Sequence, residues 1–173
     1  MTTTATSRLN EVDIETVGAL IGAIQEEPAK AQTLWSARVR WKGGFQSEVQ
    51  VREFPPVPSD EPKALGGDDR AANPVEQLLG ALGNCLAVGY AANATAAGIE
   101  LQEVSIALEG DLDLSTFLGL SPGHAGYHGI RATVNIESDA TADQIAELHN
   151  KVVATSPVGH TLSSPIPVSI ELA

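Results

Sequence analysis

The spacing of hydrophobic positions changes along the first part of the chain and predicts two kinds of element. Over about residues 11–27 the apolar residues recur at helical spacing and stop at Pro28, which predicts an amphipathic helix. Over residues 35–52 they alternate with polar residues on both sides of Gly43 and Gly44. This alternation predicts a β-hairpin with one apolar face, so we expect the sheet to cover a core on one side only.

A long loop and then a long helix with little charge follow the hairpin. Residues 54–73 are rich in Pro, Gly and Asp and predict a long loop. Pro74 suits the first turn of a helix that runs to about Ala97, with Gly98 as its stop signal. Within this helix the ionisable side chains are only Glu76, Cys85 and Tyr90. A helix so poor in charge is expected to be buried on most of its circumference.

In the last part of the chain, apolar and polar residues alternate again. Residues 103–114 and 130–137 predict two strands joined by a loop. Thr141 and Gln144 form a capping-box signature for a helix that ends before Pro157. A final strand is predicted from alternating apolar residues: Val168, Ile170 and Leu172. The order αββαββαβ, without regular βαβ units, predicts an α+β fold.

Composition limits the class of protein. A chain of 173 residues, 43% hydrophobic and 18% charged, is typical of one globular domain, here residues 1–173. No apolar run reaches the ~20 residues that span a bilayer. The first residues also lack the basic and apolar segments of a secretory signal, so we expect a cytoplasmic protein.

The net charge of −12 argues against two kinds of partner. An acidic surface repels the phosphates of nucleic acids and the headgroups of anionic membranes, so neither is expected to bind. A local basic pocket is still open, because Arg38, Arg40 and Arg52 lie close together in the sequence.

The single cysteine excludes an intrachain disulfide and a zinc site built from cysteine pairs. Three roles remain open for Cys85: a buried apolar side chain, a reactive thiol, or a bond to another molecule. His124 and His128 flank a glycine-containing loop but lack further ligands, and no dinucleotide or P-loop motif is present. We therefore expect no cofactor and no metal.

Three stretches resemble the OsmC/Ohr superfamily. The segment from Asn73 to Ala87, which contains Cys85, is similar to the central helix of that family, and residues 65–69 resemble its lead-in. Residues 156–162, followed by residues 165–168, resemble the closing segment. The resemblance covers about residues 35–173 and leaves the first helix outside. It implies antiparallel sheets wrapped around the central helix, in an interlaced homodimer with sites at the interface.

The resemblance also implies a chemistry. Peroxidase members of the family reduce organic hydroperoxides with two cysteines, and the position of the attacking thiol matches Cys85. The position of the second cysteine, which resolves the sulfenic acid, is Ser156 here. An external thiol would then have to serve as reductant.

A cation and a carboxylate complete the family site. The arginine usually comes from an N-terminal strand or loop, so Arg38, Arg40 and Arg52 are the candidates. The usual glutamate position holds Val75, and Glu76 is one residue further, which turns it by about 100° around the helix.

Three functional hypotheses follow. The first is a one-cysteine, thiol-dependent reductase of organic hydroperoxides in stress defence. The second is a non-catalytic dimeric protein that binds an apolar small molecule in the same pocket. A third, hydrolase-like use of Ser156 and His160 is weaker, because the chain has no Gly-x-Ser-x-Gly elbow.

Overall fold

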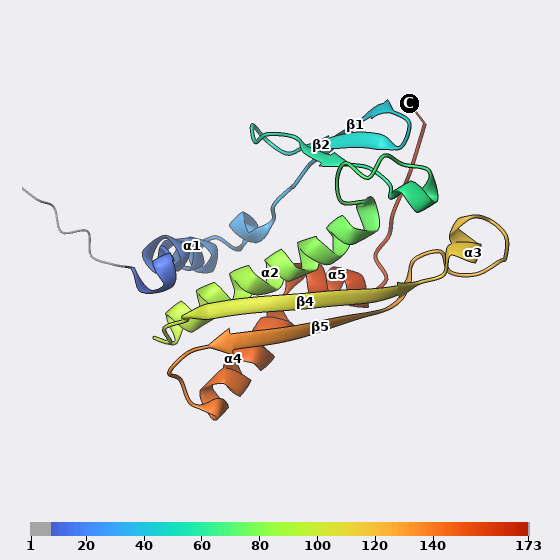
Figure 1. The fold of residues 1–173 in the computed structure, drawn as a ribbon. Helices are drawn as coiled ribbons and strands as arrows, with labels where there is room; N and C mark the ends of the chain where they lie inside the picture. The colour runs from blue at the N-terminus through green and yellow to red at the C-terminus, as the bar shows by residue number, and fades with distance from the viewer. Residues whose placement is uncertain (1–7, 173) are drawn as a thin grey trace, which may run out of the picture. The chain divides into compact units, whose positions relative to one another are not determined.

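The computed structural model describes residues 8–172 of the chain. It has a mixed α+β architecture with antiparallel sheets (Figure 1). The chain divides into two compact units. Residues 8–16 and 79–172 form one, called here the helix unit, and residues 17–78 form the other, called the sheet unit.

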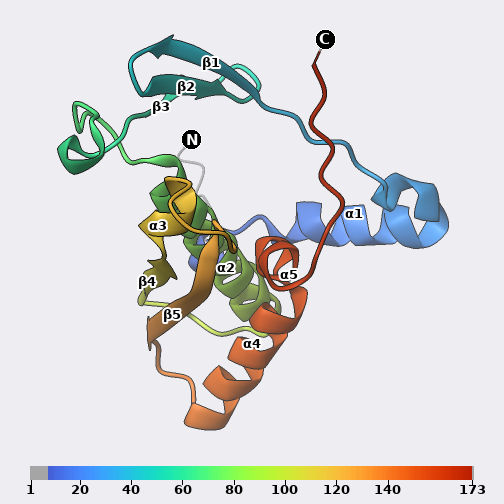
Figure 2. The same ribbon diagram turned by 90° about the vertical axis from the view of Figure 1, so that its right-hand side faces the viewer.

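The helix unit is built on the long helix α2, Pro74–Ala96, which begins in the sheet unit. Two strands and three further helices accompany it: β4 (Glu103–Leu112), α3 (Leu114–Phe117), β5 (Tyr127–Glu137), α4 (Ala142–Thr155) and α5 (Pro157–Ser163). β4 and β5 form an antiparallel two-stranded sheet that runs beside α2, with α4 packed nearby (Figures 1 and 2). As predicted, the Thr141–Gln144 capping box starts α4.

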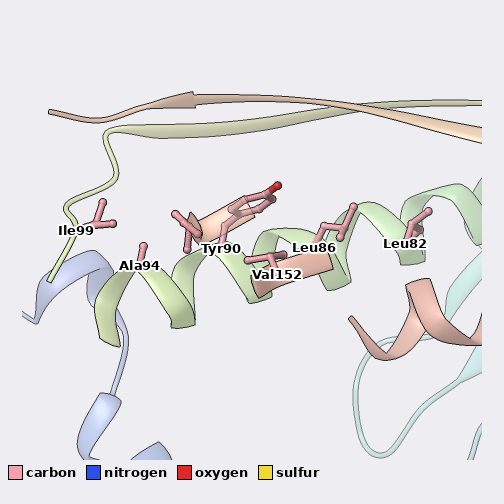
Figure 3. Packing of buried hydrophobic residues seen from close by; sticks show 7 residues of the cluster. Leu82, Leu86, Tyr90, Ala94, Ile99 and Val152 are labelled. Carbon is pink, nitrogen blue, oxygen red and sulfur yellow. The ribbon is translucent and has the colours of Figure 1, made fainter. Parts of the chain in front are cut away.

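The core of the helix unit lies along one stripe of α2. Leu82, Leu86, Tyr90 and Ala94, each four residues after the last, are buried and belong to the same hydrophobic core as Val152 of α4 (Figure 3). Side chains at a spacing of four lie above one another on one helix face. The expected burial of most of the circumference is therefore wrong for the single chain: Val88, on another face of the helix, is 70% exposed. A low content of charged residues does not by itself show how much of the surface of a helix is buried by other elements.

Both ends of α2 follow the sequence signals. At the start, the Asn73 side chain accepts from the Glu76 backbone N–H, and the Glu76 carboxylate accepts from the Asn73 N–H, both at 2.9 Å. At the end, Gly98 adopts a φ of 72°, and the Ile99 N–H donates to the Ala94 carbonyl at 2.9 Å. These contacts satisfy backbone groups that a helix end leaves unpaired.

The short 3-10 helix η1, Leu9–Glu11, is tied to the end of α2 by one side chain. Asn10 donates to the Thr95 hydroxyl at 3.0 Å and to the Ile99 carbonyl at 2.9 Å, and it accepts from the Leu101 N–H at 2.8 Å. Its φ of 51° lies in the left-handed region, which asparagine tolerates better than most residues.

The predicted first helix is confirmed as α1, Ile14–Glu26, and Pro28 begins the next short helix, η2, Pro28–Ala31. The sheet unit then contains three antiparallel strands in the order β1-β2-β3: Arg38–Gly43, Gln46–Gln50 and Val57–Ser59. The hairpin between β1 and β2 is confirmed, with positive φ at Gly43 and Gly44. Part of the predicted loop is instead β3 and the turn η3, Lys63–Leu65.

The apolar face of the sheet does not cover a core within the sheet unit, contrary to expectation. Val39, Val49 and Val57 pair across the three strands, yet Val39 and Val57 are exposed, and Trp41 on β1 is 75% exposed. The alternation correctly indicated strands, but the sheet unit does not itself supply a packing partner for this face.

The final strand predicted at Val168, Ile170 and Leu172 is wrong: residues 164–172 are without helix or strand. Strand residues need a neighbouring edge for their backbone hydrogen bonds, and none of the described strands supplies one here. Residues 157–163, for which no element was predicted, form helix α5. Among residues 8–172 no helix is long and apolar enough to cross a membrane.

Candidate functional site

Cys85 lies on α2 next to the buried stripe and is half-buried. Cys85, Val88, Gly89 and Ala92 follow the i, i+3, i+4, i+7 spacing of one helix face and line one side of a hollow of about 440 Å³. Val152, Thr155, Ser156 and Pro157 line the other side. The thiol is therefore placed at an open, largely apolar hollow between α2 and the junction of α4 and α5.

Ser156 faces the thiol directly. Its hydroxyl oxygen lies 3.3 Å from the sulfur of Cys85, although the two residues are 71 positions apart. The side chain of Ser156 is buried and is also the N-cap of α5, where it accepts from the Gly159 N–H at 3.1 Å. A thiolate carries no proton, so in that state the hydroxyl of Ser156 is the donor to sulfur.

Two glycines permit this close approach. A Cβ on Gly89 would lie 2.9 Å from a methyl group of Val152, and one on Gly159 would lie 3.0 Å from the Ser156 hydroxyl oxygen. A larger residue at position 89 would push α4 away from the face of α2 that carries Cys85, whereas one at position 159 would press on Ser156 at the start of its own helix. The hollow thus depends on the small side chain of Gly89 in its α2 wall.

Arg38, Arg40 and Arg52 are brought together in the sheet unit, where they line a hollow of about 560 Å³. Arg38 and Arg40 lie two residues apart on β1, opposite Gln50 and Glu48 of β2. The basic pocket left open by the sequence is therefore present. The predicted role of one of these arginines as the partner of Cys85 stays a prediction.

Glu76 lies at the first turn of α2, more than two helical turns before Cys85 in the same helix. Its carboxylate accepts from the Asn73 N–H in the capping box. In this structure the Glu76 carboxylate therefore caps the start of α2. Its expected role in orienting a catalytic arginine stays a prediction.

His160 is not placed as a general base for Ser156, and His124 and His128 are not part of a metal-binding cluster among residues 8–172. His160 contacts the Ala154 carbonyl at 2.9 Å through its Nε2, while Ser156 contacts Cys85 and Gly159. His124 and His128 are in edge-to-face contact, with ring centres 6.0 Å apart. Among residues 8–172, no group of three or more His, Cys, Asp or Glu side chains is arranged to hold a metal ion.

One polar pair was missed by the sequence interpretation. The hydroxyl of Tyr90, whose side chain is fully buried on the core stripe, hydrogen-bonds to Nδ1 of His149 on α4. Burial raises the pKa of Tyr90 above its usual value because the phenolate loses hydration. The spacing of Tyr90 four residues after Leu86 was a signal for its burial, but the sequence contained no signal for its partner.

Comparisons with known proteins agree on the fold. Residues 66–171 match the family model described as OsmC-like protein. The structure of an OsmC-like protein from Mycoplasma pneumoniae superposes with a TM-score of 0.66 at 18% identity, covering 76% of this chain and 89% of that one. None of the curated protein sequences compared with this chain matches it.

Two further solved structures carry functional names. An organic hydroperoxide resistance protein OsmC from Legionella pneumophila has a TM-score of 0.58 at 20% identity, covering 76% of this chain and 91% of that one. An organic hydroperoxide resistance protein from Elizabethkingia anophelis has a TM-score of 0.55 at 18% identity, with coverages of 75% and 89%. At these identities the likeness shows the fold alone.

Proposed function

The chain belongs to the OsmC-like protein family, and on that premise we propose that it is a thiol-dependent reductase of organic hydroperoxides that works with one cysteine per chain. The observation that carries the proposal is the contact of 3.3 Å between Cys85 and Ser156 at an open, largely apolar hollow. The names of two structural neighbours as organic hydroperoxide resistance proteins support the same chemistry.

In the first step the thiolate of Cys85 attacks the distal oxygen of the hydroperoxide. The O–O bond breaks, the leaving alkoxide takes a proton and departs as an alcohol, and the sulfur is left as sulfenic acid. The Ser156 hydroxyl donates to the thiolate before the attack, and hydrogen bonds to an ionised group are stronger than neutral ones. One of Arg38, Arg40 and Arg52 is proposed as the cation that offsets charge on the alkoxide.

The second step needs a reductant from outside the chain. Ser156 stands where a resolving cysteine would lie, and a hydroxyl cannot form a disulfide with the oxidised sulfur. An external thiol attacks the sulfenic sulfur, releases water and leaves a mixed disulfide. A second thiol then reduces that disulfide and regenerates Cys85. A compartment that keeps thiols reduced, such as the cytoplasm, suits this cycle.

The proposal includes a homodimer, which is typical of the family. Exposed apolar side chains of the sheet unit, among them Val39, Trp41 and Val57, support it, because exposed apolar patches mark interaction surfaces. Light scattering that gives the mass of one 18.0 kDa chain would contradict the dimer.

The decisive experiment follows oxidation of Cys85. On addition of cumene hydroperoxide we expect rapid formation of sulfenic acid at Cys85, detected by mass spectrometry, and turnover when a dithiol is supplied. Cys85→Ser should abolish both. If the thiol of Cys85 oxidises only as slowly as free cysteine, that result would contradict the catalytic proposal.

Ser156→Cys is the informative second variant. It places a thiol where the hydroxyl now lies 3.3 Å from the sulfur of Cys85. After one equivalent of hydroperoxide we expect an intrachain disulfide and the loss of both free thiols, whereas the wild-type chain stops at sulfenic acid. If Ser156→Cys keeps one free thiol after oxidation, the two positions do not meet in solution.

The second candidate function is binding of an apolar small molecule without catalysis. The mainly small and apolar walls of the Cys85 hollow, among them Val88, Gly89 and Ala92, favour it. In that case Cys85→Ser would leave the binding of the molecule unchanged, and the thiol would remain reduced after exposure to hydroperoxide.

A further inference from the structure

The six arginines of the sequence fall into two groups. Arg8, Arg70 and Arg131 each form an ion pair with a carboxylate. No carboxylate of residues 8–172 pairs with Arg38, Arg40 or Arg52, and these are the three that line the hollow of the sheet unit. In a chain with 22 acidic residues, three unpaired guanidinium groups at one place are an unusual accumulation of positive charge.

The register of the sheet places the first two arginines on one side. Side chains two residues apart point to the same face of a strand, so Arg38 and Arg40 share a face of β1. Their partners across the pair are Gln50 and Glu48, and all four side chains line the hollow. The hydrophobic residues Val39 and Trp41 occupy the opposite face of the strand.

Arg52 is held at the end of β2 by its neighbours. Its φ of 48° is left-handed, and the Gln50 side-chain amide donates to the Arg52 carbonyl at 2.8 Å and to the Phe54 carbonyl at 2.6 Å. The guanidinium of Arg52 lies over the ring of Phe54, 4.5 Å from its centre. The stacking uses the face of the guanidinium and leaves its N–H groups at the edge available as donors.

Two carboxylates also line the hollow, and they do not cancel its charge. Glu48 pairs with Lys42 at 3.2 Å. The negative charge of Glu53 is then the remaining carboxylate charge in the lining, compared with the positive charges of three arginines. Guanidinium groups bind carboxylates and phosphates in a bidentate geometry, and the ring of Phe54 adds an apolar wall beside them.

We propose that the hollow lined by Arg38, Arg40, Arg52 and Phe54 binds a small organic anion, a carboxylate or phosphate monoester that carries an aromatic or apolar group. The anionic group accepts hydrogen bonds from the guanidinium groups, and the organic group packs against Phe54. This site is formed wholly by residues of the sheet unit, and the proposal holds whether or not Cys85 reacts with peroxides.

The test is a titration of the full chain, kept reduced, with phenyl phosphate and with benzoate, followed through the arginine side-chain N–H signals in NMR spectra. We expect saturable shifts of the signals of Arg38, Arg40 and Arg52, and unchanged signals of Arg8, Arg70 and Arg131. Arg40→Gln should weaken binding by about tenfold or more, because it removes a charged donor. Saturation by only one of the two ligands identifies the anionic group.

Arg131→Gln is the matched control, because it removes the same charge from an exposed arginine paired with Asp111 and Glu109 on the other sheet. It should leave the affinity unchanged. Equal weakening by Arg131→Gln and Arg40→Gln, or parallel shifts of all six arginines, would show a general charge effect and overturn the proposal. Absence of saturable shifts with both ligands would also overturn it.

Phe54→Leu tests the organic part of the ligand separately. In the wild-type chain phenyl phosphate should bind more tightly than inorganic phosphate, and the variant should reduce that preference while it keeps the binding of inorganic phosphate. Equal affinities of the two ligands in the wild-type chain would contradict the role of Phe54.

Discussion

In the helix unit, the apolar positions of α2 meet side chains of α4, β4 and β5, and Leu86 and Tyr90 are buried. In the sheet unit the alternation is just as regular, yet Val39, Trp41 and Val57 are exposed. The helix unit therefore has its own core, whereas the apolar face of the sheet requires a cover that the sheet unit does not itself provide. A regular hydrophobic pattern indicates which face will be buried, but not whether the same chain buries it.

The largest expected effect comes from breaking the core of the helix unit. Leu86→Ala should lower the free energy of unfolding by about 3 kcal/mol, because it removes buried surface and leaves a cavity. Trp41→Ala should change the stability of an isolated chain by less than about 0.5 kcal/mol. Urea denaturation of both variants measures the difference.

The same two variants also test whether a second copy of the chain covers the apolar face of the sheet. If a second copy covers that face, Trp41→Ala should weaken dimerisation, and its effect on unfolding should be largest at high protein concentration and shrink as dilution separates the dimer. An equal, concentration-independent loss of stability in both variants would show that the chain buries the sheet face by itself.

A smaller effect on stability is expected when either of two glycines of α2 is replaced by alanine. Gly89→Ala should destabilise the fold by about 1–2 kcal/mol, because the new Cβ would lie 2.9 Å from a methyl group of the buried Val152. Gly80→Ala meets no atom within 4 Å and should stabilise the helix by up to about 1 kcal/mol. Thermal unfolding of the two variants should shift in opposite directions. A gain of stability in both would mean that α4 does not press on α2 at Gly89.

The smallest effect is a dependence of stability on alkaline pH. Burial raises the pKa of Tyr90 in the folded chain, so the unfolded chain loses this proton at lower pH than the folded one. Stability should therefore fall as the pH rises through about 10, the ordinary pKa of tyrosine, and towards the pKa of the folded chain. Tyr90→Phe should remove this component in urea denaturation across that range. Identical pH profiles of wild type and variant would contradict it.

Several elements could be predicted because their signals are local. The capping box of Thr141 and Gln144, the stop at Gly98 and the hairpin at Gly43 and Gly44 depend on residues within one turn of each other. The missed elements depend on distant partners. β3 exists because Val57–Ser59 finds an edge of β2, and the expected final strand is absent because residues 164–172 find no edge.

The sequence by itself determined the α+β class, the long helix with Cys85, and the three arginines as a possible basic pocket, since period, capping and composition are properties of neighbouring residues. The tertiary structure decided what each of these groups meets. It placed the Ser156 hydroxyl against the Cys85 sulfur across 71 positions, and among residues 8–172 it gave Arg38, Arg40 and Arg52 no carboxylate partner. Contacts between distant residues arise from packing of whole elements, and no local pattern contains that information.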